Sequence, residues 1–504
     1  MSLDRFRSMP LMAQSPMATI ARNSSFVLGI QAAVKILAFL FNVYIVRRLG
    51  DVHFGRYSAV MAYVAIFAIF TDWGMSPYAL REMAKDHGKT SYLLPNIMAI
   101  RIVLSLIILL AAPLSALWLG KDKDVVTGIL IASAGLILYA FQGPLDSALT
   151  ARERLDTTSI LTLVNQLVFW GLGVLLLING AGFIGLIIAS LAGVAVVTLL
   201  SGRMLLRLGV GQLALSPRLW PPLLRAALPF GISGIASVFM NRFDTVLMSF
   251  VLTDAAVGWY NVPWALIAMI LLIAQSIAIA AYPSMVRNYA ADPESLPRIT
   301  WQFIKYLLIV CLPIAMGGSV LANRIILTLY GTTFTHSILV LQVMLWALPC
   351  LFLLELLGRV ADTLSLERSA ARINVINALI VVALNLFLVP TIGILGGALA
   401  LVGGRAIRLV QYWRLIGNER LISPRWRSLF RVGWAAAVMG GAVFLSSQNP
   451  FFGAADSKLG LAALVGMGGV IYVVALVVLG GIERREIELL GTLFTKRLSR
   501  DTNR

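Results

Sequence analysis

Long apolar runs alternate with short polar connections along the whole chain. We count about fourteen runs that are long enough to cross a bilayer, for which a helix needs roughly 20 mainly apolar residues. Their approximate bounds are 24–47, 54–75, 93–119, 124–149, 158–180, 182–206, 227–251, 256–281, 299–322, 335–357, 370–390, 393–416, 429–447 and 458–480. The pattern predicts an all-α polytopic membrane protein, and an even number of spans places both termini on the same side.

The first apolar run contains a line of polar residues. Gln31, Lys35 and Asn42 are four and seven residues apart, which places them on one face of a helix. A charge at the centre of a bilayer costs roughly 2.5 to 3.5 kcal/mol, so we expect Lys35 to face protein, water or a ligand. Two interpretations stay open: the line hydrogen-bonds neighbouring helices, or it lines a substrate path.

Composition and charge agree with this pattern. Hydrophobic residues make up 59% of the chain, charged residues 13%, and the mean hydropathy of +0.88 is too high for a soluble fold. The net charge of +18 comes mostly from lysines and arginines in alternate short loops. By the positive-inside rule these loops and both termini are cytoplasmic, and the charge indicates no nucleic-acid partner. Arg47, Arg48 and Arg56, in the first outer loop, oppose the rule.

A short motif recurs halfway along the chain. Gly55-Arg56-Tyr57 opens the second span, and Gly258-Trp259-Tyr260 opens the eighth. Chance similarity in apolar sequence is the alternative, but a true repeat of six spans predicts two lobes related by a pseudo-twofold axis along the membrane normal. The predicted divisions are a cytoplasmic N-terminal segment (1–22), an N-terminal six-helix lobe (23–210), an inter-lobe cytoplasmic loop (211–225), a C-terminal six-helix lobe (226–417), transmembrane helices 13 and 14 (418–482) and a cytoplasmic tail (483–504).

Several short motifs follow one another in a fixed order along the chain. They are Leu49-Gly50, Phe54-Gly55, Tyr57, Asp72-Trp73-Gly74, Leu228-Pro229-Phe230, Asp244, Gly258 to Tyr260, Pro283, Tyr330-Gly331, Phe334, Asn385, Pro390, Gly393 and Gly396-Gly397-Ala398. Their order resembles the polysaccharide-transport branch of the multidrug/oligosaccharidyl-lipid/polysaccharide exporter superfamily, which includes the Wzx-type O-antigen flippases.

The resemblance implies a flippase of the cytoplasmic membrane that serves cell-surface polysaccharide biosynthesis. Such a protein moves a polyprenyl-diphosphate-linked oligosaccharide from the inner to the outer leaflet, by alternating access between two lobes around a cationic central cavity. The implied partners are this substrate, membrane lipids and polysaccharide assembly proteins.

The in-span polar residues fit an anionic sugar-bearing substrate, which needs fixed positive charge and groups that replace water around the glycan. The candidate cations are Lys35, Arg101, Arg242, Lys305, Arg405 and Arg408. The candidate amides are Asn42, Gln142, Asn165, Asn241 and Gln275. Lys35 and Arg242 are the first choices because they lie on the opening helices of the two lobes. The structural alternatives are a local Arg242 and Asp244 pair, arginine and lysine side chains that reach the inner interface, and amides that join helices.

Two carboxylates are candidates for energy coupling. Asp244, beside Arg242, is predicted either to neutralise that arginine or to bind H⁺ or Na⁺ and respond to a gradient. Asp72 is the second candidate, and its alternative is a pair with Arg81 or Lys85. Cys311 and Cys350 lie in apolar runs without neighbouring His or Cys residues, so we expect packing roles, with no metal site and no cofactor.

Two other functions compete with the flippase. A cation-coupled multidrug exporter of the same superfamily would use a buried carboxylate, which the six in-span cations make less suitable. A membrane glycosyltransferase or polymerase would need acidic residues on its outer side, but the outer loops are short. Their aspartates show no cluster along the sequence: Asp51, Asp122, Asp124, Asp254 and Asp456. We therefore predict that the protein is not an enzyme.

Overall fold

The computed structural model describes residues 16–207, 214–417, 426–453 and 457–481, and this part of the chain contains helices and no strand. The first helices are α1 (Pro16–Asp72), α2 (Met75–Lys85), α3 (Thr90–Trp118), α4 (Lys123–Ala151), α5 (Leu155–Ile178) and α6 (Gly182–Arg207). They are followed by α7 (Trp220–Val251), α8 (Asp254–Ala291), α9 (Ser295–Tyr330), α10 (Ser337–Leu345), α11 (Leu348–Thr363), α12 (Glu367–Ile392), α13 (Ile394–Gly417), α14 (Trp426–Ser447) and α15 (Lys458–Val478).

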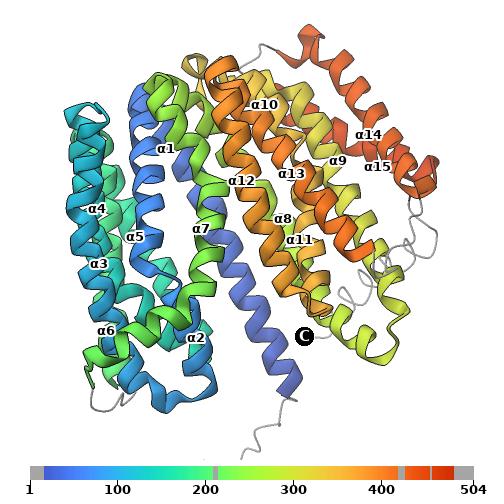
Figure 1. The fold of residues 1–504 in the computed structure, drawn as a ribbon. Helices are drawn as coiled ribbons and strands as arrows, with labels where there is room; N and C mark the ends of the chain where they lie inside the picture. Colours follow the sequence, from blue (N-terminus) through green and yellow to red (C-terminus); the bar gives the residue numbers. More distant parts are fainter. Residues whose placement is uncertain (1–15, 208–213, 418–425, 454–456, 482–504) are drawn as a thin grey trace, which may run out of the picture.

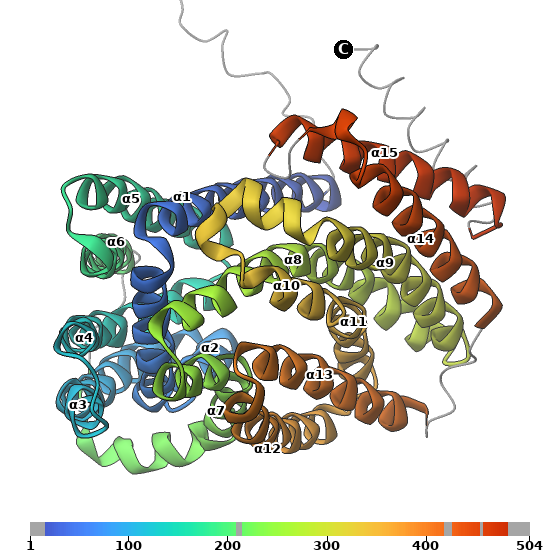
Figure 2. The same cartoon turned by 90° about the horizontal axis from the view of Figure 1, so that it is seen from above.

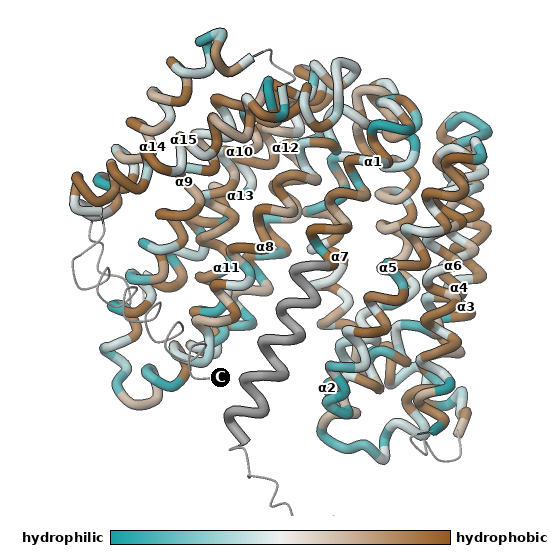
Figure 3. The backbone as a smooth tube through the Cα atoms, turned by 180° about the vertical axis from the view of Figure 1, so that it is seen from behind, coloured by the Kyte–Doolittle hydropathy of each residue, from teal (hydrophilic) through white to brown (hydrophobic). Residues whose placement is uncertain are grey.

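Most of these helices qualify as membrane spans. Among the described residues, 12 helices are long and apolar enough to cross a membrane, and α10 with α11, bent by 42°, forms one further span. Hydrophobic residues run along the helices and hydrophilic residues gather at their connections (Figure 3). Large apolar side chains such as Leu110, Leu199 and Leu445 are more than half exposed, as lipid contact requires. The protein is a multi-pass membrane protein of the predicted all-α class.

The helix α1 explains why the structure shows one span fewer than the sequence predicts. Gly50 interrupts it with φ 71° and ψ −177°, a conformation that is essentially restricted to glycine. The two arms, 16–49 and 51–72, meet at an angle (Figures 1 and 2). Counting the arms as separate spans gives the predicted number of about fourteen.

The helices gather in two groups with an appended pair. Helices α1 to α6 lie together on one side, α7 to α13 on the other, and α14 and α15 pack outside α9 (Figures 1 and 2). We call the first group the N-terminal lobe and the second the C-terminal lobe. The helix α7 begins at Trp220, within the stretch that we predicted as an inter-lobe loop.

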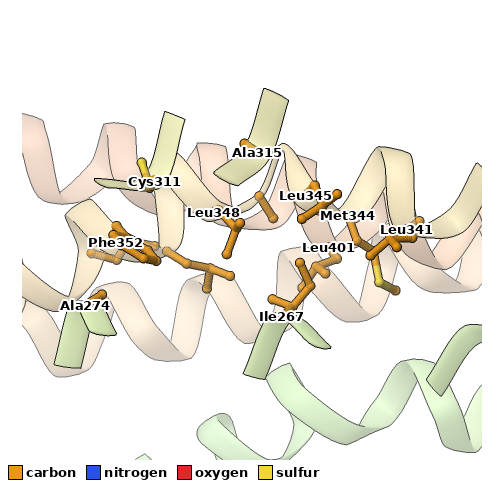
Figure 4. Packing of buried hydrophobic residues seen from close by; sticks show 14 of the residues in the cluster. Ile267, Ala274, Cys311, Ala315, Leu341, Met344, Leu345, Leu348, Phe352 and Leu401 are labelled. Carbon is orange, nitrogen blue, oxygen red and sulfur yellow. The ribbon is translucent and has the colours of Figure 1, made fainter. Parts of the chain in front are cut away.

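The largest apolar core lies in the C-terminal lobe. Leu348 and Phe352 of α11 are fully buried and pack against residues of α8, α9, α10 and α13 (Figure 4). Cys311 belongs to this core, and both cysteines are free thiols, so the predicted packing role of Cys311 is confirmed. This packing fixes the position of α11, which also lines the polar cavity described below.

The short helix α2 is amphipathic. Met75, Ala79 and Met83, four residues apart, are fully buried against the N-terminal lobe. Glu82 accepts hydrogen bonds from Lys89 at 2.7 Å and Lys85 at 3.0 Å, which lower its pKa to about 2. The helix is not among the candidate spans.

Two arginines assigned to outer loops have structural roles instead. Arg324 was expected in a loop, but α9 continues to Tyr330 and buries it. Its guanidinium donates hydrogen bonds to the carbonyls of Ser447 at 2.9 Å and Phe452 at 3.1 Å, and so joins α9 to the connection between α14 and α15. Arg47 donates to the carbonyl of Leu329 at 2.5 Å, at the C-terminal end of α9, where a cation is favourable.

Candidate functional site

The larger polar cavity lies inside the C-terminal lobe and has a volume of about 530 Å³. We call it the C-lobe cavity. Five helices contribute to its wall: α7, α8, α11, α12 and α13. Its charged lining residues are Arg359, Arg405, Arg408, Glu355, Asp362 and Glu367. Its aromatic and uncharged polar residues are Trp264, Tyr412, Ser233, Ser237, Asn241, Gln275 and Asn374. Three arginines face three carboxylates, so the lining is balanced in charge, whereas the resemblance implied a cationic cavity.

Two arginines on α13 present unused hydrogen-bond donors in this cavity. Arg405 is 4% exposed, and one terminal nitrogen donates to Asn241 Oδ1 at 2.7 Å. The buried Nε atoms of Arg405 and of Arg408, three residues later, have no hydrogen-bond partner among the described residues. The Arg408 guanidinium lies 5.5 Å from the centre of the Tyr412 ring. Buried donors without acceptors are costly, so both side chains favour a ligand that brings acceptor oxygens.

The acidic side of the cavity belongs mainly to α11. Glu355 is half-buried, interacts electrostatically with Arg405, and makes no hydrogen bond within the described part of the chain. One turn later Arg359 and Asp362 form an ion pair at 3.4 Å. Sequence analysis missed Glu355 because it is a single acidic residue in an apolar run. Its isolation in that run was the available signal.

A second polar group, centred on Asp244, interacts with Arg405. Asp244 accepts a short hydrogen bond from the hydroxyl of Tyr260 and a 2.7 Å bond from the Thr245 amide. It also interacts electrostatically with Arg405. Arg242 is exposed and forms no ion pair with Asp244, both of which the structure describes. The side chain that bonds to Asp244 is therefore Tyr260, the tyrosine of the repeated motif, rather than Arg242.

The smaller cavity lies in the N-terminal lobe, between α1, α3, α4 and α6, and has a volume of about 260 Å³. We call it the N-lobe cavity. Most of its lining side chains are apolar, with Thr71, Arg101, Tyr139 and Ser190 as polar exceptions. Arg101 is 5% exposed and donates to Asp72 and to the Ser76 hydroxyl, both at 2.7 Å.

The partner of Asp72 differs from the sequence-based expectation. Asp72 pairs with Arg101 rather than with Arg81 or Lys85, and the Arg101 side chain is buried. Gly143 makes room for the guanidinium, because a Cβ atom there would lie 2.3 Å from Arg101 Nη1. The N-lobe cavity therefore contains a charge that the protein itself already neutralises.

The sequence can now be compared with known proteins. Residues 20–289 match the profile of the family described as "Polysaccharide biosynthesis protein". This chain belongs to the polysaccharide biosynthesis protein family. Membership confirms the resemblance to the polysaccharide-transport branch of the exporter superfamily.

Two proteins whose sequences are similar to this chain come from Haloferax volcanii. The probable low-salt glycan biosynthesis flippase Agl15 is 24% identical over 421 residues, which cover 81% of this chain and 86% of that protein. The probable flippase AglR is 28% identical over 162 residues, or 31% of this chain and 34% of that protein.

Solved structures show the same fold. The lipid II flippase MurJ, in an inward closed conformation, matches with a TM-score of 0.75 and 13% identity over 89% of this chain and 97% of that chain. An inward-facing multidrug resistance MATE family transporter of the MOP superfamily matches with a TM-score of 0.61 and 15% identity, over 77% and 98% of the two chains. These similarities show that this chain has the same fold as those two proteins.

The predicted site residues fall into separate places. Asn241, Gln275 and Arg405 come together in the C-lobe cavity, together with Arg408. Gln142 donates to Asp146 at 3.0 Å and accepts from Thr198 at 2.8 Å, which joins α4 to α6. Asn165 packs against Gly193 of α6. These last two positions agree with the interpretation that the amides hold helices together.

The remaining predicted residues line neither of the two cavities. Lys35 and Arg242 are exposed on α1 and α7. Lys305 is buried in α9 at 6% exposure, and the buried Oδ1 of Asn42 accepts no hydrogen bond from the part of the chain that the structure describes. Gln31 belongs to α1, but its side chain lies outside the described residues. The two first choices for the headgroup site are therefore separate from the arginines that the C-lobe cavity presents.

Proposed function

We propose that this protein is a flippase that moves a polyprenyl-diphosphate-linked oligosaccharide across the membrane, with the headgroup bound in the C-lobe cavity. One observation carries the proposal: Arg405 and Arg408 have buried Nε donors without a partner among the described residues, and both line a cavity whose other groups suit sugars. Guanidinium groups pair well with phosphate oxygens, since their donors can form two parallel bonds.

The rest of the lining suits a glycan. The rings of Trp264 and Tyr412 offer apolar faces, while Asn241, Gln275 and Asn374 offer amides that can replace water around hydroxyl groups. The volume of about 530 Å³ lies within the usual range for small-molecule sites. The cavity therefore has room for the polar head alone, and the lipid chain stays in the bilayer.

The orientation follows from charge. Because most lysines and arginines fall in alternate loops, we place both termini in the cytoplasm. The cytoplasmic membrane as the location, and transport from the inner to the outer leaflet, are what the family resemblance implies. The names of Agl15 and AglR, both probable flippases, support this class over an enzyme. Association with polysaccharide assembly proteins and coupling to H⁺ or Na⁺ through Asp244 or Asp72 belong to the same proposal.

A cation-coupled multidrug exporter is the second candidate. Glu355, Asp362 and Glu367 line the same cavity, and such carboxylates could bind a cationic drug. The exporter reading predicts that a cationic dye uses this cavity and that an anionic lipid-linked sugar does not. The two candidates thus differ in the sign of the substrate charge.

Reconstituted protein tests the choice. Proteoliposomes would receive a fluorescent polyprenyl-diphosphate oligosaccharide in one leaflet, and its appearance in the other leaflet would be followed by quenching, in parallel with the transport of a cationic dye. We expect protein-dependent movement of the lipid-linked sugar, lost in Arg408→Gln and retained in Arg48→Gln, which removes an exposed arginine outside the cavity. Transport of the dye alone would establish the exporter and overturn the flippase.

A further inference from the structure

We propose that the two copies of the repeated motif form a reciprocal latch, which holds the two lobes together at one end and must open before the cavity can face that side. The motif is longer than its Gly-x-Tyr core. Asp51 precedes Gly55 by four residues, and Asp254 precedes Gly258 by four residues. One copy begins the second arm of α1 and the other begins α8, at the end of the molecule opposite α2 (Figure 1).

The two glycines allow the copies to touch through their backbones. A Cβ atom on Gly55 would lie 1.7 Å from the carbonyl oxygen of Asp254, and one on Gly258 would lie 2.3 Å from that of Asp51. Each glycine thus makes room for the aspartate backbone of the other copy. Any larger residue at either position would push the two lobes apart.

The residue after each glycine bonds to the aspartate of the opposite copy. Arg56 Nε donates to Asp254 Oδ2 at 2.8 Å, and Trp259 Nε1 donates to Asp51 Oδ2 at 3.0 Å. Equivalent positions of the repeat therefore exchange equivalent contacts. Such exchange is expected at a pseudo-twofold axis, where each copy presents the same surface to the other.

The connection between α3 and α4 reinforces this contact. Asp122 and Asp124 lie 3.4 and 3.2 Å from the Arg56 guanidinium. Lys121 donates to the carbonyl of Ser249 in α7 and lies 4.3 Å from the centre of the Phe250 ring. Three of the aspartates that form no cluster along the sequence, Asp122, Asp124 and Asp254, thus gather around one arginine.

The opposite end is joined differently. There Gly74 of the N-terminal lobe packs against Gly231 of α7, backbone to backbone. Between the described residues of the two lobes, Arg56 with Asp254 is the one ion pair. Both side chains remain about one-fifth to one-quarter exposed, at 20% and 24%, so water can replace their contact when the lobes separate. The latch is therefore reversible and acts at one end alone.

A distance measurement between the lobes tests the latch without any substrate. Spin labels would be placed at the exposed Thr127 in α4 and Thr335 before α10, in a chain that carries Cys311→Ala and Cys350→Ala. In the otherwise unmodified protein we expect one dominant short distance. The double variant Arg56→Gln with Trp259→Phe should raise the ratio of long to short distances at least tenfold.

Matched variants separate the latch from general damage. Arg48→Gln removes a neighbouring exposed arginine and should leave the distances unchanged. Trp259→Phe alone keeps an aromatic ring beside His336, 4.3 Å away in the native protein, and should give an intermediate ratio even if the double variant folds poorly. Arg56→Gln and Asp254→Asn should have the same effect singly and together. Unchanged distances in folded Trp259→Phe and Arg56→Gln proteins would overturn the latch.

Discussion

Each lobe buries an arginine beside a cavity, but the two arginines are satisfied in different ways. In the N-lobe cavity, Arg101 is neutralised by Asp72 at 2.7 Å, and the lining is mainly apolar. In the C-lobe cavity, Arg405 donates to the neutral Asn241 and forms no ion pair with any described residue. The buried Nε atoms of both arginines lack a partner in the part of the chain that the structure describes. A charge within a membrane helix is therefore the stronger candidate for a ligand site where no carboxylate of the protein pairs with it.

The largest effect is expected at Arg101, whose charge Asp72 neutralises, and it concerns the free energy of unfolding. Arg101→Met should lower the free energy of unfolding by about 3 kcal/mol, because it leaves the carboxylate of Asp72 without its partner. Unfolding by denaturant in detergent measures the change. The double variant with Asp72→Leu should recover most of the stability. A stable single variant would mean that water already solvates Asp72.

The second effect concerns transport rather than stability. Arg405→Gln should slow flipping about a hundredfold, equivalent to about 2.7 kcal/mol, since it removes a charged donor from the headgroup but keeps a side chain that can bond to Asn241. Its unfolding should change far less than that of Arg101→Met. Initial flipping rates and unfolding curves would be compared at equal protein level. Normal flipping by Arg405→Gln would place the headgroup elsewhere.

Glu355 should have a smaller effect on the flippase. Glu355→Gln keeps a hydrogen-bond acceptor for sugar hydroxyls and loses only the extra strength of a charged bond, so we expect about fivefold slower flipping. Rates for the lipid-linked sugar and for a cationic dye would be measured side by side. A dye rate that falls to zero while the sugar rate is unchanged would assign the cavity to cations.

The smallest effect is expected at the exposed cation of α1. Lys35→Met should change flipping by less than about twofold, because Lys35 lines neither cavity and an exposed charge contributes little binding energy. Complementation of a flippase-deficient strain, with protein level matched, provides the measurement. A loss as large as that of Arg405→Gln would move the headgroup site from the C-lobe cavity to the space that Lys35 faces.

The sequence predicts the helical class and the set of charged residues because both are local properties. Hydropathy identifies the spans, and Arg405 stands out as a cation within one. The partners of these charges depend on contacts between distant segments. Asp72 and Arg101 are 29 residues apart, and Arg56 and Asp254 are 198 apart, so no spacing rule connects them. The same reason explains why Asp244 was paired with its neighbour Arg242 instead of Tyr260.

The repeated motif was visible in the sequence, but its purpose was not. Gly55 and Gly258 could be matched by their spacing, whereas their contact depends on how α1 crosses α8. Glu355 was missed for a related reason. A single carboxylate in an apolar run attracts attention only when the opposing helix is known to bring Arg405 close.

Arg324 sets a requirement on the order of synthesis. Its guanidinium is satisfied by backbone carbonyls of residues 447–453, and the first of these is made 123 residues after the arginine itself. At about 5 to 20 residues per second, the ribosome needs roughly 6 to 25 s to reach it. During that interval the carbonyl groups of Ser447, Phe452 and Gly453 that bind this arginine do not yet exist. The nascent chain must therefore keep this end of α9 at the aqueous surface or inside the insertion machinery until the last helical hairpin arrives.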